Sequence, residues 1–171
     1  VPKPGVQERI LLHLRDYVDH AEKVEVPFAL SQMGIANAVS IARSNVPRAI
    51  SGLRDQGYLV EKQAHVTGVS RKRKAYFLTD EGAKLADDIW SKVGKQNVRV
   101  IGKDGRASNM ELAEALENTD LPLRHVDVIR YLDDSGTIDL SVLSADLIER
   151  DLSKHIEKQL VTSLSDLPRT R

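Results

Sequence analysis

The sequence predicts a mainly α-helical protein with one small β-hairpin, an α+β fold. Apolar residues recur every three or four positions along most of the chain, the spacing that places them on one face of a helix. The exception is residues 58–78, where two short extended segments flank a turn that contains Thr67-Gly68. Of the 171 residues, 41% are hydrophobic, which is typical of a chain that folds around a core.

The first part of the chain alternates helices with short extended segments. Helices are expected at residues 6–20, 32–39, 44–56 and from residue 80 onward. Ser31, Ser44 and Thr79 each precede one of these helices, and we expect each hydroxyl to cap its helix by accepting a backbone N–H. Residues 24–30 read as an extended segment, and Pro27 confines this segment to an edge or an irregular strand.

The remaining two-fifths reads as a separate, small helical accessory unit with a strand pair. A boundary at residues 94–97 divides the chain into domains 1–95 and 96–171, the second with a dimerisation or regulatory role. Its expected strands are 98–101 and 137–140, and its expected helices are 109–118, 122–134 and 144–165. The pattern Ser108-Asn109-Met110-Glu111 is typical of a capping box at the start of the first of these helices.

The formal net charge of zero hides an asymmetry along the chain. Residues 1–95 hold 15 Lys and Arg against 11 Asp and Glu, whereas residues 96–171 hold 10 against 14. Within residues 43–74 the count is 8 against 2. A basic island on a balanced chain is the electrostatic pattern of a localised nucleic-acid surface, although cations on a solvated face would give the same count.

Several classes of function are disfavoured by what the sequence lacks. The chain has no cysteine, so disulfides and cysteine-based zinc sites or nucleophiles are excluded, and a cytoplasmic location is expected. No apolar run approaches the ~20 residues that span a membrane. The histidines show no metal-ligand spacing, and Gly102-Lys103-Asp104-Gly105 lacks the spacing of a phosphate-binding loop. We therefore expect no enzyme activity, no catalytic residue, no metal and no cofactor.

The helix expected at about 44–56 presents a polar, arginine-bearing face. With Val46, Ile50 and Leu53 toward the core, the helical period places Asn45 and Arg48 on the opposite side. An arginine can donate two hydrogen bonds to guanine, and an asparagine can pair with adenine. The residues expected in a DNA major groove are Ser44, Asn45, Arg48 and Ser51, with Arg43 and Arg54 on phosphates at its edges.

A basic run, Arg71-Lys72-Arg73-Lys74, follows in the expected hairpin turn at 66–74. Four like charges in a row repel one another, and contact with phosphates would relieve this repulsion. Taken alone, the run also fits a solvated loop or a localisation signal. After a helix with an arginine-bearing face, it fits the wing of a winged helix-turn-helix, lying on the DNA backbone or in the minor groove. Sequence-specific binding of double-stranded DNA, as a transcriptional regulator, is the resulting prediction.

Three segments also resemble a known family. They are residues 43–53, residues 57–60 and residues 71–82, where an aromatic-Leu-Thr-x-Glu-Gly pattern follows the basic run. Residues 7–90 thereby resemble a winged helix-turn-helix of the MarR-like type, and are similar to N-terminal modules of archaeal regulatory proteins. The resemblance implies DNA binding, often as a homodimer on a pseudo-palindrome. Unlike typical MarR-like proteins, the chain has only six residues before this region, where a dimerising helix usually lies.

Two other functions remain open at this point. A winged helix can bind a protein partner in place of DNA, which would make this chain a protein-interaction module. Alternatively, the chain can be the recognition arm of a larger signalling protein.

Overall fold

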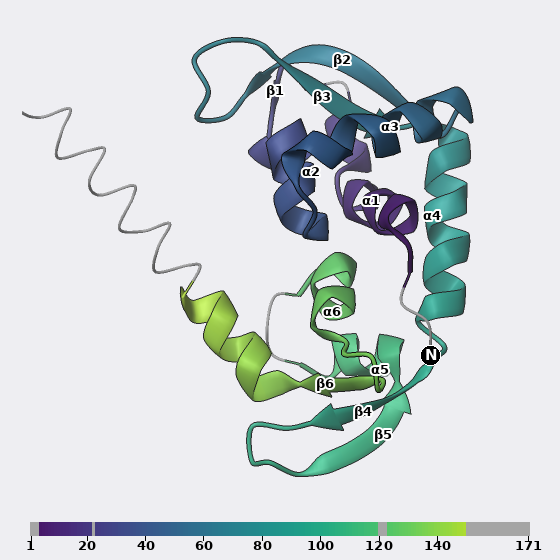
Figure 1. The fold of residues 1–171 in the computed structure, drawn as a ribbon, viewed down its shortest axis with the longest axis vertical. Helices are drawn as coiled ribbons and strands as arrows, with labels where there is room; N and C mark the ends of the chain where they lie inside the picture. Colours follow the sequence, from purple (N-terminus) through teal and green to yellow (C-terminus); the bar gives the residue numbers. More distant parts are fainter. Residues whose placement is uncertain (1–3, 22, 120–122, 150–171) are drawn as a thin grey trace, which may run out of the picture.

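The structure is a computed structural model that describes residues 4–21, 23–119 and 123–149 (Figure 1). In its first part three short helical turns interrupt the order of helices and strands. The helices are α1 (Val6–Arg15), α2 (Gln32–Val39), α3 (Val46–Asp55) and α4 (Asp80–Val93). The strands are β1 (Glu25–Val26), β2 (Leu59–Val66) and β3 (Arg73–Leu78). The α+β fold class with a winged helix-turn-helix is therefore confirmed.

The hairpin of β2 and β3 forms the wing. These strands pair antiparallel from Leu59↔Leu78 to Ala64↔Arg73, and β1 adds to β2 in parallel through Glu25↔His65. The segment expected to be extended at residues 24–30 is a strand only at β1, and the turn that follows Pro27, Phe28–Leu30, is a 3-10 helix. This turn brings the chain directly to the start of α2.

Two of the three expected helix caps are confirmed, and the third is wrong. The Ser31 Oγ accepts the Gly34 N–H at 3.1 Å, and the Thr79 Oγ1 accepts the Gly82 N–H at 3.0 Å. Ser44, in contrast, lies inside a 3-10 turn, Arg43–Asn45, and α3 begins only at Val46. The backbone N–H of Val46 already donates to the Arg43 carbonyl, so the turn itself satisfies a donor that a capping side chain would take.

The second part contains a three-stranded sheet in the order β5-β4-β6. Its elements are β4 (Asn97–Ile101), β5 (Ala107–Glu111), α5 (Leu112–Glu117), α6 (His125–Tyr131), β6 (Thr137–Asp139) and helical residues 140–149. The expected strands near 98–101 and 137–140 are present. Of the helix expected at 144–165, residues beyond 149 lie outside the described residues, as does Pro122.

The capping box expected at Ser108–Glu111 is wrong, because this segment is strand β5. It pairs antiparallel with β4 from Asn97↔Glu111 to Ile101↔Ala107. The helix expected from residue 109 starts instead at Leu112, with Glu111 in the N-cap position. Pairing with a strand about ten residues earlier satisfies the backbone groups that a capped helix would otherwise satisfy locally.

One hydrophobic core joins the two parts, with α1 at its centre. Figure 1 shows α1 between α2 and α4, with α6 beneath it. Buried aliphatic side chains from both parts belong to the same cluster, among them Leu11 and Leu12 of α1 and Val126 and Ile129 of α6. The division into domains 1–95 and 96–171 stays a prediction, and its expected boundary lies in the turn between α4 and β4.

A buried histidine connects α1 to α6. The His13 side chain is fully buried, and its Nε2 lies 2.7 Å from the Ala29 carbonyl oxygen. The guanidinium of Arg124, just before α6, donates to the Tyr17 hydroxyl at 2.8 Å and lies 3.1 Å from His13 Nδ1. Burial lowers the pKa of His13 to about 4. The neutral ring therefore donates through Nε2 and accepts from Arg124 through Nδ1.

Candidate nucleic-acid interface

Helix α3 faces the core with its apolar side and solvent with its polar side. Val46, Ile50 and Leu53 are at most 2% exposed. Arg48 and Ser51 are exposed on the opposite side, as the helical period predicts. The orientation of α3 that the sequence predicts is therefore the one observed.

The polar residues before α3 extend this exposed surface. Arg43, Ser44 and Asn45 are all exposed and form the 3-10 turn that leads into the helix. Farther along the helix, Gly52 faces a side chain of α1, because a Cβ on Gly52 would lie 2.5 Å from the Gln7 amide nitrogen. Exposed polar side chains therefore run from the turn before α3 onto the helix itself.

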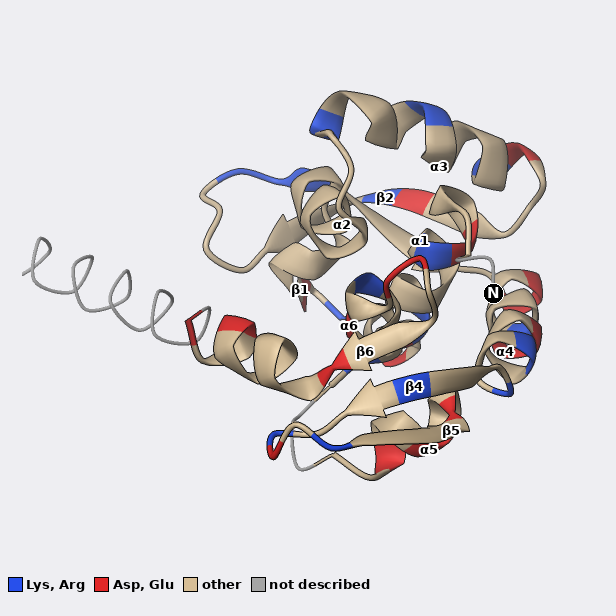
Figure 2. Cartoon of the chain, turned by 60° about the horizontal axis from the view of Figure 1, so that its bottom comes forward, with Lys and Arg blue, Asp and Glu red and all other residues tan. Residues whose placement is uncertain are grey.

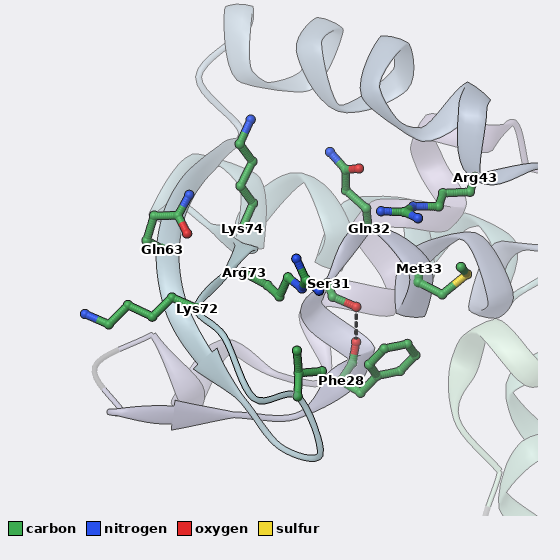
Figure 3. A pocket seen from close by; sticks show the side chains of 10 residues that line it. Phe28, Ser31, Gln32, Met33, Arg43, Gln63, Lys72, Arg73 and Lys74 are labelled. Atoms are coloured by element: carbon green, nitrogen blue, oxygen red, sulfur yellow. Dashed lines mark hydrogen bonds between the residues drawn. The ribbon is translucent and has the colours of Figure 1, made fainter.

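A groove separates the beginning of α2 from the wing, with the turn before α3 at one end (Figure 3). It encloses about 780 Å³. Its lining residues are Phe28, Ser31, Gln32, Met33, Arg43, Gln63, Val69, Lys72, Arg73 and Lys74. This lining contains four cationic side chains and no acidic one. Such a groove suits a polyanion whose backbone passes between the two walls.

Four of the expected site residues, from two segments that lie apart in sequence, line this groove. Figure 2 shows the cationic segments on α3 and along the tip of the wing. Arg43 joins Lys72, Arg73 and Lys74 in the groove, whereas Arg71 is exposed in the turn between β2 and β3. Within the described residues, neither Arg43, Arg48 nor any cation of 71–74 forms an ion pair. These charges are therefore free to bind an external anion.

Arg54 differs from the other expected site residues. It lies in the last turn of α3, and its Nη1 is 3.6 Å from Oε1 of Glu61 on β2. Asp55 follows it directly and is exposed. The end of α3 is thus less favourable to a phosphate than its beginning.

One wall of the groove consists of residues that were not predicted from the sequence. Phe28, Gln32 and Met33 line one wall and come from the segment around the start of α2. Phe28 and Met33 are 42% and 39% exposed, so both present apolar surface beside the cations. The sequence does contain one signal for this wall. The helix cap expected at Ser31 places Gln32 and Met33 in the first turn of a helix, and this position could have identified them as candidate site residues.

Comparisons with known proteins match only solved structures. No family model matches the chain, and no curated protein matches it. One matching structure is the zinc-responsive MarR-family member ZitR of Lactococcus lactis, 22% identical over 53% of this chain and 54% of that chain, with a TM-score of 0.39. Another is a putative DNA-binding protein of Ralstonia eutropha, 26% identical over 50% and 94%, with a TM-score of 0.36.

A third match extends over most of the chain. MepR, a transcription regulator of the Staphylococcus aureus multidrug efflux pump MepA, is 15% identical over 92% of this chain and 80% of its own, with a TM-score of 0.38. ZitR is described as a member of the MarR family. This is also the family that residues 7–90 resemble in sequence. In the ZitR match given above, the chain spans about half of that chain's length.

Two further properties concern the described residues alone. None of the helices in these ranges is long and apolar enough to cross a membrane. In the same part of the chain, no group of three or more His, Asp and Glu side chains is placed to hold a metal ion.

Proposed function

We propose that this chain is a transcriptional regulator that binds double-stranded DNA in a sequence-specific manner. The observation that carries the proposal is the convergence of unpaired cations from the turn before α3 and from the wing on one groove without acidic lining. A protein that binds a phosphate backbone needs several cations on one continuous surface.

In this proposal the beginning of α3 enters the major groove. Arg48 donates to guanine from the exposed side of the helix, and Asn45, exposed in the turn before the helix, pairs with adenine or a phosphate. Ser44 and Ser51 are short enough to contact bases or phosphates at close range. Arg43 contacts a phosphate at the edge of the groove. One good bidentate base contact is worth about 1–3 kcal/mol of discrimination.

The wing supplies the contacts that do not depend on sequence. Arg71, Lys72, Arg73 and Lys74 are all exposed and lie on the backbone or in the minor groove of the DNA. We further propose that two copies bind a pseudo-palindromic site, with residues 96–171 serving as the accessory domain. Such a homodimer would place two α3 helices in successive major grooves.

A salt series tests the proposal. Binding of mixed-sequence duplex DNA is measured by fluorescence anisotropy for the wild type and for Arg71→Ala/Arg73→Ala. Since log K falls with log salt by about 0.9 per neutralised phosphate, removing two contacts should flatten the slope by about 1.8. The control is Lys84→Ala/Lys92→Ala, which removes two exposed cations of α4 and should leave the slope unchanged. Absence of binding at low salt, or an equal effect of both variants, contradicts the proposal.

A further inference from the structure

Arg54 stands apart from the other cations of residues 43–74. Its Nη1 lies 3.6 Å from Oε1 of Glu61, and within the described residues no other cation of this segment has an acidic partner. The Arg54 side chain is 48% exposed, whereas the Glu61 side chain is 23% exposed. Arg54 is therefore accessible from solvent while its partner is set into the protein surface.

Glu61 is held in place by a chain of hydrogen bonds. Its Oε1 accepts the hydroxyl proton of Tyr76, the residue opposite it in the β2–β3 ladder, at 2.9 Å. The Tyr76 oxygen in turn accepts from Nε2 of Gln32 at 3.0 Å. Tyr76 is 1% exposed, so the phenol that fixes Glu61 cannot move into solvent without unpacking the core. The acceptor for Arg54 is thus fixed.

The fixed carboxylate stands next to the cationic groove. Side chains two residues apart on a strand share one face, about 6.6 Å apart along it, and Gln63 follows Glu61 by two. Gln63 lines the groove and pairs with Lys74 across the ladder. Glu61 is one of only two acidic residues within 43–74, so its position beside the groove is conspicuous in a segment with eight cations.

We propose that Glu61 withholds Arg54 from DNA. This inference rests on the proposed function. Arg54 and Glu61 meet the DNA as a neutral pair, and Arg54 releases no counterion from the phosphate backbone. A phosphate contact at Arg54 would strengthen binding to every sequence equally, because phosphates carry no sequence information. Withholding it lowers non-specific affinity and leaves discrimination to Arg48 and Asn45, so Glu61 is a positioning residue for specificity.

Glu61→Gln tests this role, because the amide oxygen can still accept from Tyr76 while the charge is lost. Anisotropy titrations with a mixed-sequence duplex should show a salt slope steeper by about 0.9 than the wild type, an additional ~3.5-fold fall in affinity between about 50 and about 200 mM salt. Arg54→Ala alone leaves the Glu61 carboxylate without its cation, so its slope should be no steeper than that of the wild type. The double variant Arg54→Ala/Glu61→Gln, which is neutral at both positions, should have the wild-type slope. Glu81→Gln, which removes an exposed acid of α4, is the control and should change nothing.

Each deviation from this pattern has a definite meaning. An unchanged slope for Glu61→Gln overturns the inference, and so does a slope for the double variant that is flatter than the wild type, because Arg54 would then already contact DNA in the wild type. A steeper slope that persists in the double variant also overturns it, since Glu61 would then act by direct repulsion. A wild type that binds no DNA removes the proposed function and this inference together, whereas the other results leave the proposed function intact.

Discussion

The buried His13 should make the stability of the protein depend on pH in a defined window. Folding lowers its pKa from 6.5 to about 4, mainly because burial disfavours the charged ring. The folded state therefore binds the proton less readily than the unfolded state. The resulting stability is fully present above pH 6.5 and is lost as the pH falls toward the folded pKa. Since one pKa unit corresponds to ~1.36 kcal/mol, the loss between pH 7 and pH 4 should be about 3 kcal/mol.

Urea unfolding of the wild type and of His13→Gln, at several pH values between 4 and 7, measures this loss. Glutamine cannot titrate, so the free-energy difference between the two proteins should shrink by about 3 kcal/mol from pH 7 to pH 4. His65→Gln is the matched control, because His65 is exposed on β2, and its difference from the wild type should vary much less. A difference between wild type and His13→Gln that stays constant with pH would refute the assignment of a buried neutral histidine.

Four other substitutions have definite expected outcomes. Ser31→Ala should lower the free energy of unfolding by about 1 kcal/mol through loss of the α2 cap. Ser44→Ala removes no cap and should change the free energy of unfolding by less than about 0.5 kcal/mol. Urea unfolding of the two variants compares these values. Gly34→Ala should cost at least about 1–3 kcal/mol in the same assay, because the new Cβ would lie 2.1 Å from the Phe28 carbonyl oxygen. Arg48→Ala should relax base preference at one position of the bound sequence, and an equal loss of affinity for all sequences would refute base reading by Arg48.

The sequence predicts best those features that depend on neighbouring residues. The apolar stripe of α3 determines which side chains face solvent, so Arg48 and Ser51 could be assigned to the outer face before the structure was known. The caps at Ser31 and Thr79 are equally local, since each hydroxyl reaches an N–H three residues later.

The errors arise where distant or competing backbone partners decide the outcome. Ser44 has the composition of a cap, but a 3-10 turn with its own hydrogen bonds occupies that position. The segment Ser108–Glu111 has a helix-start pattern, yet β4 offers it a complete strand ladder. Local preference is weak compared with such pairing, so a pattern of four residues could not decide between the two.

The candidate site was predicted in part for the same reason. The sequence shows its two basic segments, around residues 43–48 and 71–74, because the charge of a Lys or Arg side chain does not depend on the fold. The wall formed by Phe28, Gln32 and Met33 requires knowledge of how α2 packs against the wing. The ion pair of Arg54 with Glu61 likewise depends on where β2 passes the end of α3. The sequence does not show this contact, and the expectation from the sequence was therefore a phosphate contact for Arg54.

Selection of bound sequences from random duplex DNA tests the central claim most directly. Sequence-specific binding predicts enrichment of a defined motif, arranged as two symmetric half-sites when a homodimer binds. It also predicts that Arg48→Ala relaxes one position in each half-site. Recovery of DNA with no enriched motif, or of no DNA at all at low salt, would contradict the account.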